Sequence, residues 1–387
     1  IFPGSADSAR SVLSTIAGAM IGVAGTIFSI TLVVLTLASS QFGSRLLRNF
    51  MYDRLNQVVL GSYISTFIYC LLVLNAVEDS NLQVFLPIIS VLVAIVLVII
   101  NMFLLIVFIH HVAVSIQSDN VVYNITSTLT RHIREKFRKN KKEDTLNTAQ
   151  ASLNFKEYES TYHSKDTIRS KKSGYLQSID IDSLLRYAKD QNLLLKINYK
   201  PGDFVVEHLN MIEVYSFEPC SENISRRIAD SIIIGGVRTP LQDSKYAIHQ
   251  MVEIASRALS PGVNDPYTAI ACIDNLTAVL CYLAEADFPS KYLFDDTKTL
   301  RIVNCPVTFS GIINTAFNQI RQFAAGSPSV LIRLMDALQL INNFTKDTDN
   351  NAFVMKHAEM VMRLAESNFE EANDVADMKN RFNALTN

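Results

Sequence analysis

The chain has 387 residues, 49% of them hydrophobic, and its 35 Lys and Arg nearly balance its 37 Asp and Glu. This balance fits a large soluble protein as well as a membrane protein. It does not indicate the basic surface that binds nucleic acid, and no nucleic-acid partner is expected. The five cysteines form no CxxC pair, which argues against a disulfide framework and a structural zinc site.

The first predicted element is a helix in the charge-free run from Ser11 to Ser44. Its small and polar residues recur at heptad spacing, and positions three, four and seven apart share one helix face. This stripe, in which Leu32 is the one large residue, consists of Ser11, Thr15, Gly18, Gly22, Gly25, Ser29, Leu32, Thr36, Ser39 and Gly43. The opposite side, which we expect to face lipid, carries Leu13, Met20, Ile27 and Val34.

Two interpretations of the stripe stay open. Ser, Thr and Gly leave room and hydrogen bonds for water, as a pore lining requires, with Leu32 as a hydrophobic constriction. Alternatively, Gly18 and Gly22 form a GxxxG spacing, which lets helix backbones pack closely in lipid. The two are compatible, because a homo-oligomeric pore crowds its helices around an axis.

Two further charge-free runs, Leu55 to Val77 and Asn81 to Ile109, predict a second and a third transmembrane helix. Each run is long enough to cross a hydrocarbon core of about 30 Å. Arg45 and Arg48 lie between the first two helices, and a segment rich in Lys and Arg follows the third. By the positive-inside rule, both segments are cytoplasmic. Arg45 and Arg48 are therefore candidates for the inner mouth of a pore.

This topology places the start of the chain outside the cell. An N-terminus usually reaches that side after a signal peptide or an upstream membrane helix, and the segment IFPGSADSAR contains neither. We therefore expect at least one further N-terminal membrane helix that this numbering does not include.

The sequence predicts a mainly α membrane protein with four parts. Residues 1–117 form the transmembrane domain, and residues 118–172 a basic juxtamembrane helix and a polar linker. Residues 173–217 read as a small β-α-β-β module whose last two strands join at a Pro-Gly turn. Residues 218–387 read as helices throughout.

Several helix boundaries of the last part follow from local signals. The segment SKYAIHQMVEIASRAL has an apolar stripe at helical spacing, and the break SPGVND follows it. Asn264 or Asp265 is placed to cap the next helix, with Pro266 in its first turn. Further helices are expected at 306–324, 328–343 and from 351 to the end.

Catalytic signatures are lacking. The sequence contains no GxSxG, Walker A, HExxH, GxGxxG or EF-hand pattern, so we expect no enzyme, no cofactor and no metal. The membrane segments also lack Asp, Glu, Lys and Arg, which ion-coupled carriers usually place at mid-membrane.

Two loops are the candidate cytoplasmic sites. In IIIGGVRTPLQD, the glycines and Arg238 suit a phosphate-holding loop, although a turn between helices capped by Thr239 explains them more simply. Asp243 of the same loop has Arg238 or Lys245 as a possible partner.

The second loop, RALSPGVNDPYTA, contains Arg257, Asn264 and Asp265. It suits an anion site or a contact between subunits. The structural alternative is a helix stop followed by a helix start.

Four segments of the chain, SITLVVLTLASSQFGSRLLRNFM, HHVAVSIQ, RTPLQD and EIASRALSPGVNDPYTAIACID, resemble the signature segments of a bacterial family of predicted integral membrane proteins, domain of unknown function 2254. The resemblance spans nearly the whole chain. It implies a bacterial inner-membrane protein, and an additional membrane helix ahead of Ile1. It implies no activity, substrate or catalytic residue.

The leading hypothesis is a homo-oligomeric channel in the lipid bilayer that conducts inorganic ions and carries a cytoplasmic regulatory domain. The alternative is a membrane-anchored sensor or scaffold whose cytoplasmic domain binds a partner or a small ligand. A symmetric oligomer with conductance would favour the first hypothesis, and capture of a ligand by the cytoplasmic part would favour the second.

Overall fold

The computed structural model describes residues 6–43, 54–80, 83–85, 87–115, 117–137, 155 and 157–386. The described chain is mainly helical. It divides into two compact units, Ile1–Val121 and Val122–Asn387, and each is described by itself.

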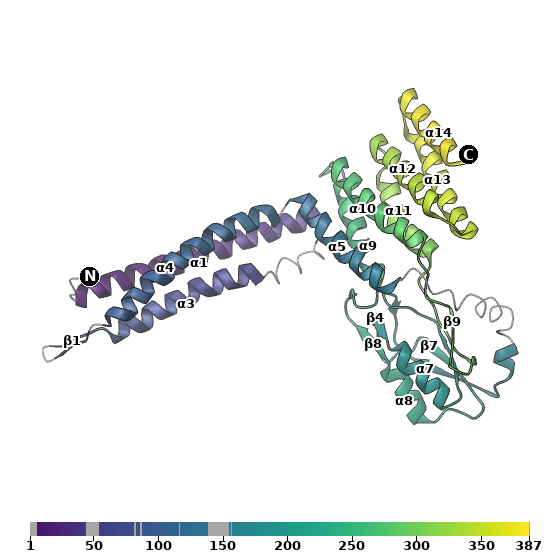
Figure 1. Ribbon diagram of the computed structural model, residues 1–387, viewed down its shortest axis with the longest axis horizontal. Helices are drawn as coiled ribbons and strands as arrows, with labels where there is room; N and C mark the ends of the chain where they lie inside the picture. Colours follow the sequence, from purple (N-terminus) through teal and green to yellow (C-terminus); the bar gives the residue numbers. More distant parts are fainter. Residues whose placement is uncertain are drawn as a thin grey trace. The chain divides into compact units, whose positions relative to one another are not determined.

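The first unit is built from three long helices that run side by side (Figure 1). They are α1 (Ala6–Phe42), α3 (Arg54–Ala76) and α4 (Ile88–Ser115). A short antiparallel hairpin, β1 (Glu78–Ser80) and β2 (Gln83–Phe85), joins α3 to α4. The three predicted membrane segments therefore form helices, because a long apolar segment satisfies its backbone groups internally only as a helix.

Two hydrophobic clusters hold these helices together. In the first, Leu13 of α1 packs with Cys70 of α3 and Ala94 of α4. In the second, Met20 and Ile27 of α1 pack with residues of α3 and α4, including Phe108. The order of these contacts along the chain makes α1 and α4 parallel and α3 antiparallel to both.

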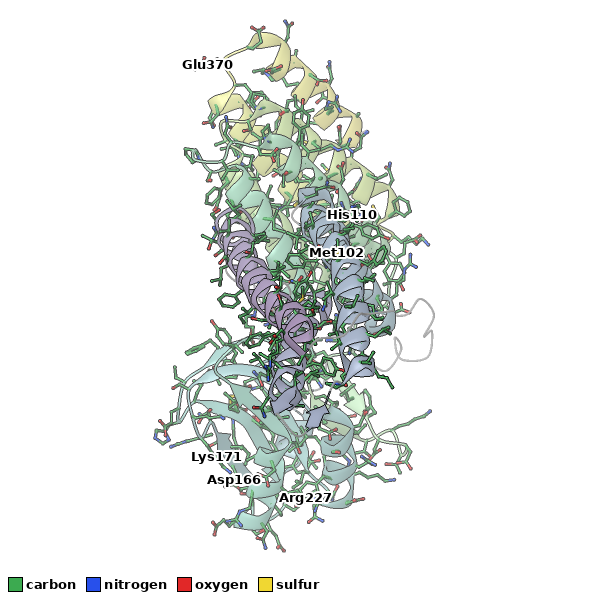
Figure 2. All side chains as sticks on the ribbon, turned by 90° about the vertical axis from the view of Figure 1, so that its left-hand side faces the viewer. Met102, His110, Asp166, Lys171, Arg227 and Glu370 are labelled. Atoms are coloured by element: carbon green, nitrogen blue, oxygen red, sulfur yellow. The ribbon has the colours of Figure 1, made fainter. Side chains whose placement is uncertain are left out.

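The outer surface of this unit is apolar. Large side chains are exposed along all three helices, for example Phe28 at 54%, Leu72 at 67% and Met102 at 61%, the last of which is labelled in Figure 2. Exposed apolar surface on this scale is typical of protein that contacts lipid. Among the described residues, four helices are long and apolar enough to cross a membrane: the three above and Pro266–Ala284.

The fourth apolar helix, α10 (Pro266–Ala284), belongs to the second unit. Its most apolar window is 61% buried inside the protein, against 17 to 28% for the other three. It packs against α9 (Tyr246–Ala258) and α12 (Pro328–Phe344). Its apolar residues are thus already covered by neighbouring protein, which a sequence-based hydropathy criterion cannot detect.

Two small sheets lie in the second unit. The five-stranded sheet has the order β3-β7-β5-β10-β9, antiparallel except for the β5–β10 pair. Its strands are β3 (Ser164–Arg169), β7 (Asn210–Ser216), β5 (Leu194–Ile197), β10 (Leu300–Val303) and β9 (Tyr292–Phe294). The antiparallel three-stranded sheet, of order β6-β4-β8, contains β6 (Phe204–Val205), β4 (Gly174–Ile179) and β8 (Ile232–Gly235).

The predicted β-α-β-β order occurs in the chain, but it is not an independent module. Helix α7 (Ile181–Asp190) follows β4 as expected, yet β4 and β5 belong to different sheets. The expected last strand is split into β6 and β7, because the backbone turns at His208, which has a positive φ of 65°. Both sheets are completed when the strands of this segment pair with β3, β8 and β10, which lie outside it. The periodicity of a sequence gives no information about such pairing.

The expectation that residues 218–387 are helical throughout is wrong for β8, β9 and β10. Apart from the connecting loops, the rest of that range is helical, and so is α5 (Ser118–Lys136). The remaining helices are α8 (Glu222–Asp230), α11 (Phe309–Phe323), α13 (Thr348–Asn368) and α14 (Ala372–Thr386). The single helix expected from 351 onward is two helices, since α13 ends at Asn368 and α14 starts at Ala372. Helices α9 to α14 pack together (Figure 1).

Candidate functional site

The stripe of small and polar residues lies on the exposed face of α1. Ser11, Thr15, Gly18, Gly22, Gly25, Ser29, Leu32 and Thr36 are all exposed in the single chain, and Ser39 is half-buried. Leu32, the one large member, is 48% exposed. A Cβ atom added at Gly18, Gly22 or Gly25 would meet no described atom within 4 Å. Within the described chain, no other helix packs closely on this face.

The opposite side of α1 does not face lipid as expected. Leu13, Met20 and Ile27 are at most 6% exposed, because they form the contact with α3 and α4, and Val34 is half-buried. The apolar residues Leu13, Met20 and Ile27 therefore make the interface within the unit. The exposed side of α1 is mixed, because it carries the small and polar stripe beside large apolar side chains such as Phe28 and Val33.

The hydroxyl groups of the stripe are hydrogen-bonded to their own helix. Thr15 donates to the carbonyl oxygen of Ser11 at 2.7 Å, and Ser29 donates to that of Gly25 at 2.9 Å. Thr36 makes the same bond to Leu32 at 2.9 Å. Each hydroxyl proton is thus satisfied, while the oxygen can still accept a hydrogen bond from water or from a neighbouring helix.

Inside the unit, Asn101 of α4 links the helices through neutral hydrogen bonds. Its side chain is fully buried, accepts from Ser62 at 2.7 Å and donates to Thr66 at 2.8 Å, both on α3. Tyr63 donates to the Asn101 carbonyl oxygen at 2.8 Å. The amide also approaches the sulfur of Met20 on α1 at 3.8 Å. A buried amide in an apolar helix thereby finds the partners that burial demands.

The predicted inner-mouth residues, Arg45 and Arg48, lie outside the described residues. Their role stays a prediction.

In the second unit, the candidate loop after β8 is organised by an ion pair. Arg238 Nε donates to Asp243 Oδ2 at 2.9 Å, and its terminal NH₂ group contacts the same oxygen. The Asp243 side chain is 4% exposed and that of Arg238 is 21% exposed. The other carboxylate oxygen accepts from the backbone N–H of Lys245 at 3.0 Å. Of the two partners predicted for Asp243, Arg238 forms the ion pair, and Lys245 contributes its backbone.

The same loop joins several elements of the unit. The Gln242 side chain pairs with the backbone of Ile179 of β4 through two hydrogen bonds of 3.0 and 3.2 Å. The main-chain carbonyl oxygen of Gln242 accepts a hydrogen bond from Lys136 of α5. Gly202 of the predicted Pro-Gly turn, at φ 97°, lies so close to Asp243 that a Cβ there would be 2.6 Å from Oδ2. The loop therefore connects α5, β4 and this turn to the start of α9.

Lysine ammonium groups gather around this pair. Burial lowers the pKa of Lys136, and the neighbouring Asp243 opposes that shift. Burial also lowers the pKa of Lys245, and the positive charge of Lys200 lowers it further. Lys200 itself contacts Asp203 at 3.3 Å. Asp243 thus stabilises a locally cationic region, which makes it the residue on which the joint depends.

The turn between helices that was expected for the GGVRTP segment is wrong. Gly235 ends strand β8, and Thr239 does not cap a helix, because α9 begins only at Tyr246. The phosphate-holding interpretation stays a prediction. The Gln177 side chain donates to the Val237 carbonyl oxygen at 2.8 Å, and a Cβ at position 235 would lie 2.3 Å from the Gln177 amide nitrogen. A side chain at 235 would therefore displace the end of the flexible Gln177 side chain and its hydrogen bond to Val237.

The second candidate loop is a helix stop and start. Asp265 caps α10 by accepting from the Thr268 N–H at 3.1 Å, and Asn264 adopts a positive φ of 49°. Ser260 donates to the Arg257 carbonyl oxygen at 2.6 Å, and the Arg257 side chain lies 3.8 Å from Glu253. Helix α9 separates this loop from the Arg238–Asp243 pair, since the pair precedes its first turn and Arg257 lies in its last.

Sequence analysis missed the partners of Asn101 and a cleft in the sheet region described below. Ser62 and Thr66 are four residues apart and so share a helix face, which was an available signal. Among the described residues, no group of three or more His, Cys, Asp or Glu side chains is placed to hold a metal ion. The absence of a metal or cofactor stays a prediction.

Comparison with known proteins gives a consistent result. A family described as "Predicted membrane protein (DUF2254)" matches residues 1–340. Three curated mycobacterial proteins are each 30% identical over 381 residues, which cover 97% of this chain and 72% of the relative. They are Uncharacterized protein MT1328 and Uncharacterized protein Rv1290c of Mycobacterium tuberculosis and Uncharacterized protein Mb1321c of Mycobacterium bovis. No solved structure matches significantly.

Proposed function

Because this chain belongs to the DUF2254 family of predicted membrane proteins, we propose that it is the subunit of a homo-oligomeric channel. In this proposal α1, α3 and α4 span the bacterial inner membrane, and the unit that contains α10 is a cytoplasmic regulatory domain. The exposed stripe of α1 lines the conduit for inorganic ions, Leu32 constricts it, and Arg45 and Arg48 ring the inner mouth.

The observation that carries the proposal is which side of α1 is buried within the unit and which side is exposed. Its apolar residues Leu13, Met20 and Ile27 are buried inside the unit, while the Ser, Thr and Gly stripe is exposed. In a bilayer, a face of this kind gains little from contact with acyl chains. Water along a symmetry axis, or the same face of another copy, satisfies it better, and a channel provides both.

The burial of α10 supports the proposed topology. Its neighbours α9 and α12 cover its apolar residues, so it does not require lipid. With α10 outside the membrane, the basic segment after α4 and the rest of the chain lie on the cytoplasmic side, as the distribution of Lys and Arg favours.

The decisive experiment measures conductance and oligomeric state of the purified chain in lipid bilayers. We expect a symmetric oligomer that conducts ions. Gly25→Leu and Ser29→Leu, which place bulk on the stripe, should reduce the single-channel conductance several-fold or abolish it. Ile30→Phe is the matched control, because Ile30 is exposed on α1 and lies neither three, four nor seven residues from any member of the stripe, and it should conduct like the unmodified chain.

Three outcomes would refute the channel. These are a monomer in the membrane, an oligomer whose axis is filled with lipid, or equal conductance in the stripe variants and in Ile30→Phe. A sensor or scaffold would then be the better description, and the second unit would be the place to look for its ligand.

A further inference from the structure

A cleft opens in the sheet region of the second unit, apart from every residue assigned above to the pore or to the candidate loops. Its volume is about 310 Å³. One wall is the turn from β3 to β4, and the other is the end of α8 with the following strand β8. The lining residues are Ile168, Arg169, Ser170, Lys171, Lys172, Met211, Ala229, Asp230, Ile232, Ile233 and Ile234.

The interior of the cleft is apolar. Ile168 and Met211 come from the paired strands β3 and β7 and belong to the hydrophobic core, and Ile232 and Ile234 of β8 pack against that core. Strands β3 and β8 are both at the edge of their sheets, so the cleft lies where the two sheets leave their edges open. Ile233 of β8 is 54% exposed there. An apolar ligand would cover apolar surface that the protein itself leaves exposed.

The rim of the cleft is cationic. Arg169, Lys171 and Lys172 are exposed, and no ion pair or hydrogen bond holds their charged groups among the described residues. Asp230 is the one carboxylate of the lining, so positive charge exceeds negative charge by two. Figure 2 labels Lys171 in this region. It also labels Asp166 of β3 and Arg227 of α8, and β3 and α8 are in contact with each other.

These cations differ from those around Asp243. There, Arg238 and Lys200 are each matched by a carboxylate within the fold. At the cleft, three neighbouring cations keep full donor capacity beside an apolar floor. Charged groups of this kind bind carboxylate or phosphate oxygens through charge-assisted hydrogen bonds.

We propose that this cleft binds a small amphiphilic anion, a free carboxylate on a short hydrocarbon chain. The hydrocarbon lies on Ile168, Met211, Ile232 and Ile234, and the carboxylate is held by Arg169, Lys171 and Lys172. One water molecule occupies roughly 30 Å³ in the liquid. At the same volume for each non-hydrogen atom of a ligand, the cleft holds about ten such atoms. Octanoate has that size, and small-molecule clefts combine an apolar lining with a few polar groups in the same way.

Two simpler ligands fit less well. A free inorganic anion would use the cations but leave the apolar floor without a role. A neutral hydrocarbon would use the floor but leave the unpaired cations without one. The proposal does not depend on ion conduction, because the cleft lies entirely within the second unit.

The test uses the full-length chain in phosphatidylcholine nanodiscs and a photoreactive octanoate analogue that carries a diazirine. Peptide mapping should find the label on residues 168–172 and 229–234. Octanoate should compete for labelling, whereas n-octanol, which lacks the charge, and inorganic phosphate, which lacks the chain, should require at least about tenfold higher concentration.

Charge variants test the rim. The triple variant Arg169→Gln, Lys171→Gln, Lys172→Gln should reduce octanoate affinity at least about tenfold, since each lost charge-assisted hydrogen bond weakens binding. The matched control removes three exposed cations away from the cleft on the same unit, Lys298→Gln, Lys356→Gln and Lys379→Gln, and should bind octanoate normally. Ile233→Ser tests the apolar part and should weaken binding about threefold.

The proposal is overturned if the unmodified chain fails to bind octanoate at millimolar concentration, if both triple variants behave alike, or if phosphate or octanol competes as well as octanoate. A photoreactive phospholipid that labels the same peptides would assign the cations to the bilayer surface, and this result would also overturn it. Lys171→Gln alone, a single exposed position, provides the same comparison if the triple variant proves unstable.

Discussion

The two units of this protein bury polar groups in different ways. In the helical first unit, Asn101 is held by Ser62 and Thr66, and each participant is neutral. In the second unit, Arg238 pairs with Asp243, and Arg301 pairs with Asp295 at 2.8 Å with both side chains at most 9% exposed. Among the described residues, the first unit thus buries only neutral polar groups, whereas the second also buries ion pairs.

The difference follows from the surroundings of each unit. A charged group inside a bilayer has no water around it, so an imperfect ion pair there is costly. A neutral amide needs only one or two hydrogen bonds to offset the cost of its burial. In the second unit, the carboxylate of Asp295 keeps its charge easily, because hydrogen bonds from Thr297 and Arg301 outweigh its burial and lower its pKa to about 2. The cost of removing one partner should therefore differ between the units.

The largest effect is expected at the ionic joint. Asp243→Ala leaves the buried Arg238 guanidinium and the nearby lysines without their counter-charge, and should lower the unfolding free energy of the second unit by about 3 kcal/mol. Hydrogen exchange of the full chain, read separately for peptides of each unit, measures it, and the first unit should be unaffected. Asp190→Ala, at an exposed aspartate, is the control and should change stability by less than about 0.5 kcal/mol. Equal effects of the two substitutions would contradict the role of Asp243.

A second effect depends on pH and again belongs to the second unit. His357 is 1% exposed, and its burial together with the charge of Arg321 lowers its pKa from 6.5 to about 4. The unfolded chain therefore binds a proton between these values that the folded chain does not. Stability is complete above pH 6.5, falls as the pH decreases to about 4, and is constant below it; the loss from pH 7 to pH 5 is about 2 kcal/mol.

Thermal unfolding at pH 7 and pH 5 measures this loss. His357→Gln, which keeps a side chain able to bond to Asn314, should remove most of the pH dependence. His208→Asn removes a histidine whose side chain is 80% exposed and should leave the pH dependence unchanged. If both variants keep the full dependence, another group is responsible.

The neutral network of the first unit should contribute less. Asn101→Leu removes two hydrogen bonds between α3 and α4, each of about 0.6 kcal/mol in a membrane, and should destabilise the unit by about 1.2 kcal/mol. Unfolding in mixed micelles, followed by exchange of α4 peptides, measures it. Met102→Leu, at the adjacent exposed position, should have no effect. A loss for Asn101→Leu as large as that for Asp243→Ala would remove the contrast between the units.

The smallest effect is expected at the α10 cap. Asp265→Ala removes the side chain that accepts from the Thr268 N–H and should lower the stability of the second unit by about 1 kcal/mol. Asp265→Asn keeps an acceptor in place and should lose little. If conductance also changes in Asp265→Asn, the loop has a function beyond capping, as the sequence alternative for Arg257, Asn264 and Asp265 allowed.

Local signals in the sequence determined much of this protein. The charge-free runs predicted α1, α3 and α4, and Asp265 with Pro266 predicted the start of α10, because hydrophobic periodicity and capping act over a few residues. The four signature segments were sufficient to predict the family, which the comparison confirms.

Only the tertiary structure decided which face of each element is covered. The sequence separated the two sides of α1 correctly but assigned Leu13 and Met20 to lipid, because a periodic pattern does not state what packs on each side. Strands β8 to β10 were missed for a related reason: they are only three or four residues long, too short for a periodicity signal, and they are stabilised by pairing with other strands. The cleft at Lys171 and the contacts of the Asp243 loop with Gly202 and Lys136 likewise join segments that only folding brings together, whereas the Arg238–Asp243 pair spans five residues and was predicted.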